Sequence, residues 1–300
     1  MAARIDPVTL RLVVAVMDTG TIAEAAEREH IAPSAVSKRL SDLEDSLNTV
    51  LVQRTNRGIE PTAAGLELLG LARNVLNDLD NIHLRLRDYA SGARGLVRVL
   101  SNLSAITEFL PQCLHSFSMH YPNVQVQLQE RISSAVQQGV ASNAADVGIY
   151  AHGIGGVEGL VTMPFRCDEL VVVVPVDHAL AARDAVRIVD TIAYDYVGLH
   201  TGSYINQQIL KAASECEKPF RCRVQVTSFD ALSLMVEAGM GIAVMPKAIG
   251  LRYSALARIK VLALDEAWAR RELRICVRSF DSLSVAAKLF VSHLSARQPQ

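Results

Sequence analysis

The sequence lacks a strong excess of charge of either sign. Its 300 residues carry 30 Lys and Arg against 31 Asp and Glu, so the formal net charge is −1. A near-zero net charge gives no overall basic field, and any contact with a polyanion must therefore be local. A chain of this length is long enough for two domains, or for one domain with an appendage.

Long apolar runs are also missing. The run Leu12–Met17 is too short to span a bilayer, and Asp6, Pro7 and Arg11 precede it. We see neither a membrane segment nor a signal peptide, and we expect a cytoplasmic protein that does not contact a membrane.

Cysteine is scarce and scattered, with five residues and no C-x-x-C pair. A disulfide framework is not expected in a reducing compartment. Cys216 and Cys222 are the only close pair, which leaves a thiol switch as an alternative, although close spacing alone does not set disulfide geometry. No Cys/His cluster has zinc spacing and no G-x-S-x-G is present, so we predict no metal, no cofactor and no enzymatic activity.

The first 60 residues predict three short helices. The stretch "DPVTLRLVVAVMDTG" has one apolar face and ends at Gly20. Thr21 and Glu24 form the T-x-x-E pattern of a capping box at the start of the second helix. The third helix is expected to begin at Pro33 and to end at Asn48, which can adopt the left-handed conformation.

The third helix has two contrasting faces. Its apolar residues recur at spacings of four, three and four, at Val36, Leu40, Leu43 and Leu47. Its opposite face carries small hydroxyls and one long cation, at Ser34, Ser37, Lys38 and Ser41. Such a face suits close approach to base edges and phosphates, and a helix-turn-helix places it in the major groove. A solvated face of an ordinary amphipathic helix explains the pattern equally well.

The residues after this helix favour DNA binding. The stretch "NTVLVQRTNRGIEPTAAG" predicts a two-stranded hairpin with a basic tip, which is the wing of a winged helix. We expect Arg54 to contact the DNA backbone and Arg57 to enter or flank the minor groove. The predicted DNA-binding residues are Pro33, Ser34, Ser37, Lys38, Arg54 and Arg57.

A long helix should follow, because no proline falls between Thr62 and Gly92. Its apolar residues form a heptad seam at Leu68, Ala72, Val75, Leu79, Ile82 and Leu86. Burial within one domain would explain part of this seam. The other faces are polar, so one seam needs one partner, and we predict a homodimer.

From about residue 94 the pattern changes to alternating strands and helices. Residues 95–151 predict β-α-β-α-β, with one helix over 106–122, and a second such set follows. The expected fold is an α+β multidomain chain: a winged helix-turn-helix, a long linker helix and a two-lobed α/β domain joined by crossing strands.

The ordered stretches "GTIAEAAEREHIAPSAVSKRLSDLEDSL", "RTNR" and "PTAAG" resemble the N-terminal region of LysR-type transcriptional regulators. "VEAGMGIAVMP" and "PNVQVQLQE" are similar to the C-terminal region of the same family. The resemblance implies a DNA-binding domain at 1–62, a dimerising helix at 63–92 and a periplasmic-binding-protein-like effector domain at 93–300. It further implies lobe I at 93–161 and 268–300, lobe II at 162–267, and a homotetramer.

Ligands of open α/β sheets bind beyond the carboxyl ends of the strands, near helix N-termini. This rule selects Ser101, Asn102, Ser104, Arg131, Ser133, Tyr150, His152, Thr201, Ser203, Tyr204 and Phe229. Hydroxyls at helix N-termini favour anions, although each serine could equally be a plain N-cap. The resemblance implies inducer contacts at Ser104, Ser133 and Ser203. We expect a small organic acid or a similar polar metabolite.

The sequence therefore predicts a DNA-binding transcriptional regulator controlled by a small-molecule effector between two lobes. Its expected partners are double-stranded promoter DNA, the effector and further copies of the chain. Two alternatives remain: a thiol-based redox regulator that uses Cys216 and Cys222, and a solute-binding α/β protein without a DNA role.

Overall fold

The computed structural model describes residues 5–55, 58–91, 95–153, 156–215, 217 and 219–296. The chain divides into two compact units, which we describe separately. The first comprises residues 1–95 with 141–145, and the second comprises residues 96–140 with 146–300. None of the helices in the described ranges is long and apolar enough to cross a membrane.

Three short helices open the first unit, as predicted: α1 (Pro7–Thr19), α2 (Ile22–Arg28) and α3 (Pro33–Leu47). Thr21 caps α2 by accepting a hydrogen bond from the backbone N–H of Glu24. At the end of α3, Asn48 adopts the expected left-handed conformation, with φ 47°. The local signals for helix starts and ends in this region are therefore confirmed.

The three helices bury one shared apolar core. Val16 of α1, Ala25 of α2 and Val36 of α3 are completely excluded from solvent. Leu40 and Leu43 are also buried, whereas Leu47 is 39 % exposed. The predicted apolar stripe of α3 thus ends one turn early, because the chain turns away at Asn48.

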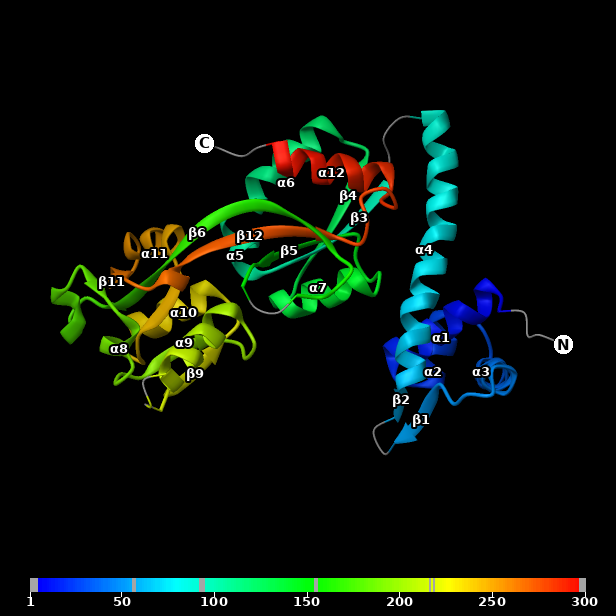
Figure 1. The fold of residues 1–300 in the computed structure, drawn as a ribbon, viewed down its shortest axis with the longest axis horizontal. Helices are drawn as coiled ribbons and strands as arrows, with labels where there is room; N and C mark the ends of the chain where they lie inside the picture. Colours follow the sequence, from blue (N-terminus) through cyan, green and yellow to red (C-terminus); the bar gives the residue numbers. More distant parts are fainter. Residues whose placement is uncertain are drawn as a thin grey trace. The chain divides into compact units, whose positions relative to one another are not determined.

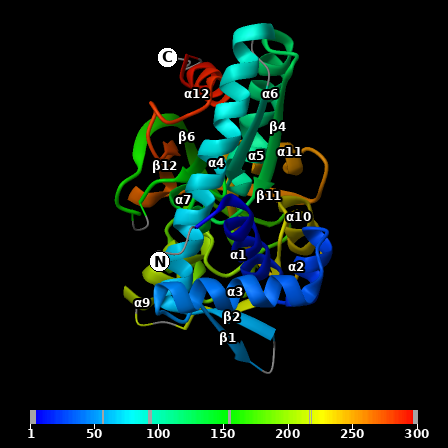
Figure 2. The same ribbon diagram turned by 90° about the vertical axis from the view of Figure 1, so that its right-hand side faces the viewer.

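The wing follows as a hairpin of β1 (Val52–Thr55) and β2 (Gly58–Pro61), paired antiparallel. Strand β2 contacts both α1 and the helix that follows the hairpin, and Figure 2 shows the hairpin below α3. Arg57 lies outside the described residues, and the side chain of Arg54 is not described either. The predicted contacts of both arginines therefore stay predictions.

The long helix α4 (Ala63–Ser91) exists, but its predicted seam is divided. Ala72 is fully buried and Leu68 packs on the core of the three helices, because the first turns of α4 lie against α1. Val75 and Ile82 are 45 % and 52 % exposed. The expectation of one continuous intermolecular seam is thus wrong for its first part; the side chain of Leu86 is not described.

A mixed sheet forms the centre of the second unit. Strands β3 (Gly95–Ser101) and β5 (Val147–Ala151) pair in parallel, and β4 (Val124–Glu130) lies beside β3. Two long strands, β6 (Val161–Pro175) and β12 (Arg270–Val277), run antiparallel and continue from one lobe into the other (Figure 1).

The second lobe builds on the far half of β6. Its residues 170–175 pair with β10 (Ala243–Pro246) and β11 (Ile259–Leu264), and β7 (Ala185–Val186) adds to the edge. The predicted strands β8 (Tyr196–Leu199) and β9 (Cys222–Val226) form a separate parallel pair instead of joining this sheet. The two-lobed α/β architecture is confirmed.

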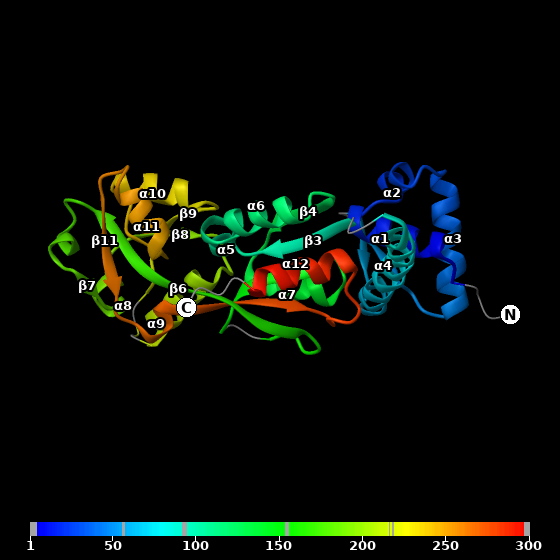
Figure 3. The same cartoon turned by 90° about the horizontal axis from the view of Figure 1, so that it is seen from above.

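The helices of the first lobe include one correction. The single helix predicted over 106–122 is two helices, α5 (Leu103–Glu108) and α6 (Leu110–His120). The break falls at Phe109, because Pro111 has no backbone N–H to donate to a preceding turn. Helix α7 (Ser133–Ala141) and the terminal α12 (Val285–Ala296) complete this lobe, with α12 packed on α6 (Figure 3).

In the second lobe the described residues form the α-helices α8 (Ile188–Thr191), α9 (Tyr204–Glu215), α10 (Phe229–Glu237) and α11 (Lys247–Ser254). Helix α10 was expected from the sequence, and so was a helix that follows Ser203 and ends near Cys216, which is α9. Helix α9 begins at the boundary between the lobes.

Candidate effector cavity and DNA-facing helix

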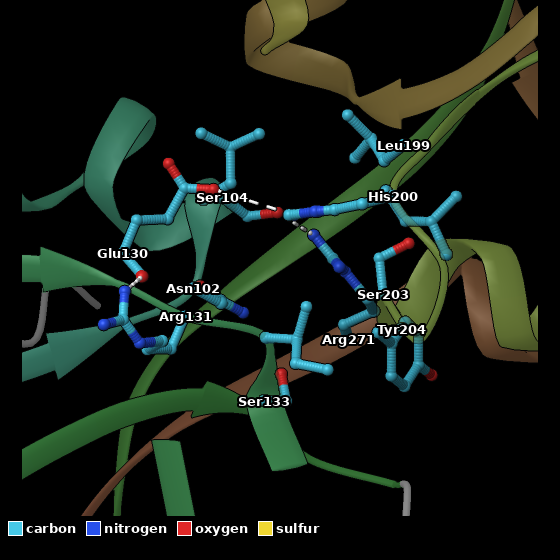
Figure 4. A pocket seen from close by; sticks show the side chains of 13 residues that line it. Asn102, Ser104, Glu130, Arg131, Ser133, Leu199, His200, Ser203, Tyr204 and Arg271 are labelled. Carbon is cyan, nitrogen blue, oxygen red and sulfur yellow. Dashed lines mark hydrogen bonds and ion pairs between the residues drawn. The ribbon is translucent and has the colours of Figure 1, made fainter. Parts of the chain in front are cut away.

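A cavity lies within the second unit, between the two lobes (Figure 4). Its first-lobe wall comes from the ends of β3 and β4, and its second-lobe wall from the loop between β8 and α9. The lining residues are Asn102, Leu103, Ser104, Glu130, Arg131, Ile132, Ser133, Leu199, His200, Ser203, Tyr204, Ile205 and Arg271. The cavity encloses about 30 Å³, which is room for about two water molecules.

Arg271 of β12 lines this cavity and bonds to several of the residues around it. Its side chain is 1 % exposed, and its guanidinium donates through Nε to Oδ1 of Asp168 at 2.8 Å and through Nη2 to Oδ2. Nη2 also donates to the Ser104 hydroxyl at 3.0 Å, and Cζ lies 5.4 Å from the centroid of the Tyr204 ring. Arg271 therefore contacts both lobes and the crossing strand β6 at once.

Glu108, the last residue of α5, faces this ion pair. Its Oε2 atom is buried and has no hydrogen-bond partner among the described residues. Burial, reinforced by the negative charge of Asp168, raises the pKa of Glu108 to about 7, although Arg271 and Arg252 act in the opposite direction. This carboxyl thus changes charge near neutral pH, close to the buried arginine.

Two helices begin at the cavity, one from each lobe. Ser133 is the first residue of α7, and its hydroxyl accepts a hydrogen bond from the Ala151 backbone at 3.1 Å. Ser203 precedes α9, and its hydroxyl accepts from the Asn206 backbone at 3.3 Å, as an N-cap does. Helix N-termini carry partial positive charge, so the two lobes together offer a site for an anion.

Charged side chains from both lobes meet at the rim. Glu130 ends β4, and its Oε1 lies 3.8 Å from Nε2 of His200, which follows β8. Arg131 is exposed and donates to the Glu130 carbonyl at 2.8 Å. Arg131 therefore supplies exposed positive charge at the rim.

The polar face of α3 is the second candidate site, in the first unit. Pro33, Ser34 and Lys38 are exposed, and Ser37 is half-buried. Lys38 has no ion-pair partner within the described part of the chain. The hydroxyls and this free ammonium group therefore share one accessible face, opposite the buried Val36.

Comparison with known families identifies both units. Residues 8–66 match "Bacterial regulatory helix-turn-helix protein, lysR family", and residues 90–299, more than half of the chain, match "LysR substrate binding domain". The chain belongs to the LysR family of transcriptional regulators.

Curated relatives of this LysR-type regulator carry related names. The uncharacterized HTH-type transcriptional regulator YbhD of Escherichia coli is 26 % identical over 288 residues, covering 95 % of this chain and 90 % of YbhD. A probable RuBisCO transcriptional regulator of Synechocystis sp. is 28 % identical over 243 residues, covering 78 % of this chain and 69 % of that protein.

Solved structures share the fold. A full-length OxyR variant from Pseudomonas aeruginosa superposes with a TM-score of 0.71 at 20 % identity, covering 98 % of this chain and 94 % of OxyR. Full-length CbnR complexed with its target DNA has a TM-score of 0.65 at 20 % identity, covering 97 % and 99 %. The regulatory domain of Synechocystis CcmR in complex with 2-PG has a TM-score of 0.61 at 23 % identity, covering 68 % and 97 %.

The cavity of this LysR-type regulator gathers six of the residues selected by the strand-end rule: Asn102, Ser104, Arg131, Ser133, Ser203 and Tyr204. The other five lie outside the lining, and each has a physical reason. Ser101 and Tyr150 are buried within strands β3 and β5, and Phe229 is buried at the start of α10. His152 is exposed after β5, and the Thr201 hydroxyl turns to Oε1 of Gln225 at 3.4 Å.

Sequence reasoning missed Glu130, His200 and Arg271. Glu130 and His200 sit at the ends of β4 and β8, so a stricter use of the strand-end rule would have selected them. Arg271 lies within a strand, 103 residues after its partner Asp168. Strand alternation is the signal that could have found it, because Arg271 shares a face with the buried Leu273 and Ile275, whereas the exposed Arg270 lies on the other face.

Proposed function

We propose that this LysR-type regulator binds a small organic acid or a similar polar metabolite between its lobes, and operator DNA through α3 and the wing. The observation that carries the effector half is the convergence of Ser133, Ser203 and Arg271 on one cavity from both lobes and a crossing strand. A ligand held there would be sensed by both lobes at once.

The charges around the cavity support a ligand with an anionic or carbonyl-bearing group. The charge of Arg271 is already compensated by Asp168, so its guanidinium would act mainly as a fixed hydrogen-bond donor. The N-termini of α7 and α9 and the exposed Arg131 supply the remaining positive potential. The regulatory domain of CcmR, which has a similar fold, was solved in complex with 2-PG, and this supports a small-molecule ligand for the domain.

The size of the cavity implies movement. A volume of about 30 Å³ cannot hold a metabolite, so the lobes would have to separate or side chains would have to turn before the ligand enters. The crossing strands β6 and β12 are the connections that would bend. A ligand that favours one lobe angle would shift the population of that conformation and thereby the DNA-bound state.

On the DNA side, the proposal assigns base and phosphate contacts to Pro33, Ser34, Ser37 and Lys38, with Arg54 and Arg57 of the wing on the backbone and minor groove. It retains a DNA-binding domain at 1–62, a linker helix at 63–92 and an effector domain at 93–300.

The exposed part of α4 supports a homodimer. Leu71, Val75 and Ile82 are each about half exposed, although they are large apolar side chains. A second α4 would cover them, and a two-fold dimer suits two-fold DNA sites. Because the chain belongs to the LysR family, the proposal also includes assembly of the chain into a homotetramer.

The thiol alternative is not favoured. Burial raises the pKa of the Cys222 thiol, which disfavours the reactive thiolate, and its sulfur hydrogen-bonds the Val224 carbonyl. Cys216 lies outside the described residues.

The DNA half is tested with Lys38→Ala and the matched variant Lys211→Ala, which removes an exposed lysine from α9. Binding is measured by gel shift to a duplex that the protein has selected from a random-sequence pool. We expect Lys38→Ala to cost about 1–3 kcal/mol of binding free energy, while Lys211→Ala changes nothing. Equal binding by the wild type and Lys38→Ala would disprove the assignment of α3.

The effector half is tested by thermal shift with a panel of small carboxylates. A ligand at one hundred times its dissociation constant should stabilise the protein by about 2.7 kcal/mol. Ser203→Leu should abolish this stabilisation, whereas Thr201→Val, two residues away and outside the lining, should retain it. If both variants respond as the wild type does, the cavity is not the effector site.

A further inference from the structure

Helix α3 carries two adjacent cations, Lys38 and Arg39, that lie in different environments. Lys38 is exposed and has no ion-pair partner within the described ranges, whereas Arg39 is held against the start of α1. Its Nη1 atom lies 3.3 Å from Oδ2 of Asp6 and donates to the Thr9 hydroxyl at 3.0 Å. Of the two positive charges beside the proposed DNA face, that of Arg39 is therefore already paired with Asp6.

The group that holds Arg39 is itself firmly placed. Oδ1 of Asp6 accepts hydrogen bonds from the backbone N–H groups of Val8 and Thr9, at 2.9 and 3.0 Å, and so caps α1. Oδ2 accepts from the Thr9 hydroxyl at 2.8 Å, and that hydroxyl in turn accepts from Arg39. The hydrogen bonds from Thr9 are the main reason why the pKa of Asp6 lies below its usual value, so Asp6 is ionised at neutral pH.

The position of this cluster relates it to DNA binding. Successive residues of an α-helix are about 100° apart, so Arg39 lies on the flank of the face that carries Lys38 and Ser34. Asp6, Thr9, Lys38 and Arg39 line one open groove between α1 and α3. Arg39 is still 45 % exposed, so an arginine released from Asp6 would be free to reach a phosphate.

We infer that Asp6 and Thr9 form a clamp that withholds Arg39 from DNA and thereby limits binding that is independent of sequence. This inference rests on the proposed docking of α3. Each cation placed on a phosphate adds affinity for any DNA sequence and steepens the salt dependence of binding by about 0.9 in log–log slope. While Arg39 is held by Asp6, the positive charge that α3 brings to DNA comes from Lys38, which lies next to the hydroxyls. The protein then discriminates between DNA sequences more strongly than it would with Arg39 on a phosphate.

The test uses Asp6→Asn, because asparagine caps a helix about as well as aspartate but cannot hold an arginine by charge. Affinity for a random-sequence duplex is measured by fluorescence anisotropy between about 50 and 200 mM salt. We expect Asp6→Asn to bind this duplex more tightly than the wild type, with an advantage that shrinks about 3.5-fold over that salt range. A merely structural role of Asp6 would not change the slope.

Two further variants separate release of Arg39 from loss of the Asp6 charge. Arg39→Met alone should leave the affinity near that of the wild type, and the double variant Asp6→Asn/Arg39→Met should lose the gain. If the double variant keeps the gain, the effect comes from removing a repulsive carboxylate, and the clamp is refuted. If Arg39→Met weakens binding as much as Lys38→Ala, Arg39 already contacts DNA, and the clamp is refuted as well.

Failure of the clamp is distinguishable from failure of the docking proposal. If Lys38→Ala binds selected DNA as the wild type does, the assignment of α3 is wrong, whatever Asp6→Asn does. If Lys38→Ala weakens binding while Asp6→Asn leaves both affinity and salt slope unchanged, the docking stands and the clamp falls. Melting temperatures of all variants confirm that the helices remain folded.

Discussion

The proposed DNA-facing helix α3 and the candidate effector cavity are constructed in opposite ways. Every residue assigned to the face of α3 comes from one run of 15 residues, and its position follows from helical periodicity. The cavity is assembled from separate segments, as distant in sequence as Ser104 and Arg271. A surface on one helix can be predicted from its own sequence, whereas a site between lobes depends on how the segments pack.

The same contrast holds for the cations of the two sites. Lys38 is exposed and free to bind a partner, so its loss should affect binding more than folding. Arg271 is buried and paired with Asp168, so its loss should affect folding first. The environment of a charge, more than its identity, decides whether it serves recognition or architecture.

The largest effect is expected from Arg271→Met. It leaves the Asp168 carboxylate buried without its partner, which costs about 3–5 kcal/mol of unfolding free energy. Urea denaturation should show this loss, whereas Lys38→Ala should stay within about 0.5 kcal/mol of the wild type. The double variant Arg271→Met/Asp168→Leu should regain most of the loss; if it is as unstable as the single variant, the ion pair is not the cause.

An intermediate effect is expected from Gly65→Ala in the first turn of α4. A Cβ atom there would lie 2.0 Å from the carbonyl oxygen of Leu51, so the backbone would have to shift, at a cost of about 1–3 kcal/mol. Gly70 of the same helix has open space around its Cβ position. Gly70→Ala should therefore stabilise the protein by about 1 kcal/mol, because alanine favours helix. Thermal melts that move in the same direction for both variants would contradict the close packing of α4 on Leu51.

The smallest effect is expected from Glu108→Gln, and it should depend on pH. The folded state raises the pKa of Glu108 from 4.5 to about 7, so it disfavours the ionised form. Wild-type stability should thus fall as pH rises from about 4.5 through about 7, and the variant should escape this loss. After solvent screening, we expect an advantage on the order of 1 kcal/mol at pH 8 that vanishes below about pH 4. A difference between wild type and variant that is constant with pH would show that the carboxyl does not titrate in this range.

Much of the first unit was predictable from the sequence because its signals are local. Pro33 and Asn48 mark the ends of α3, Thr21 caps α2, and the spacing of Val36, Leu40 and Leu43 defines the buried face. The break at Phe109 also has a local cause in Pro111, although the apolar pattern of 106–122 obscured it. These features depend on hydrogen bonds and contacts between residues a few positions apart.

The α/β pattern of the second unit was readable in the same way, strand by strand. The sequence did not reveal which strands lie next to each other. Strand β6 pairs with β12 over one half of its length and with β10 and β11 over the other half. The pairing of β6 with β12 brings Arg271 opposite Asp168. Because β6 and β12 pass from one lobe to the other, both lobes are built on the same two strands.

The sequence by itself determined the helices of the DNA-binding unit, the wing, the two-lobed pattern and the family resemblance. Only the tertiary structure decided that Leu68 and Ala72 are buried within the chain, that Arg271 occupies the cavity and that Asp6 holds Arg39. The physical reason is the range of the interactions. Periodicity and capping act between neighbours in the sequence, whereas burial and ion pairing between distant segments are set by the register and packing of the whole fold.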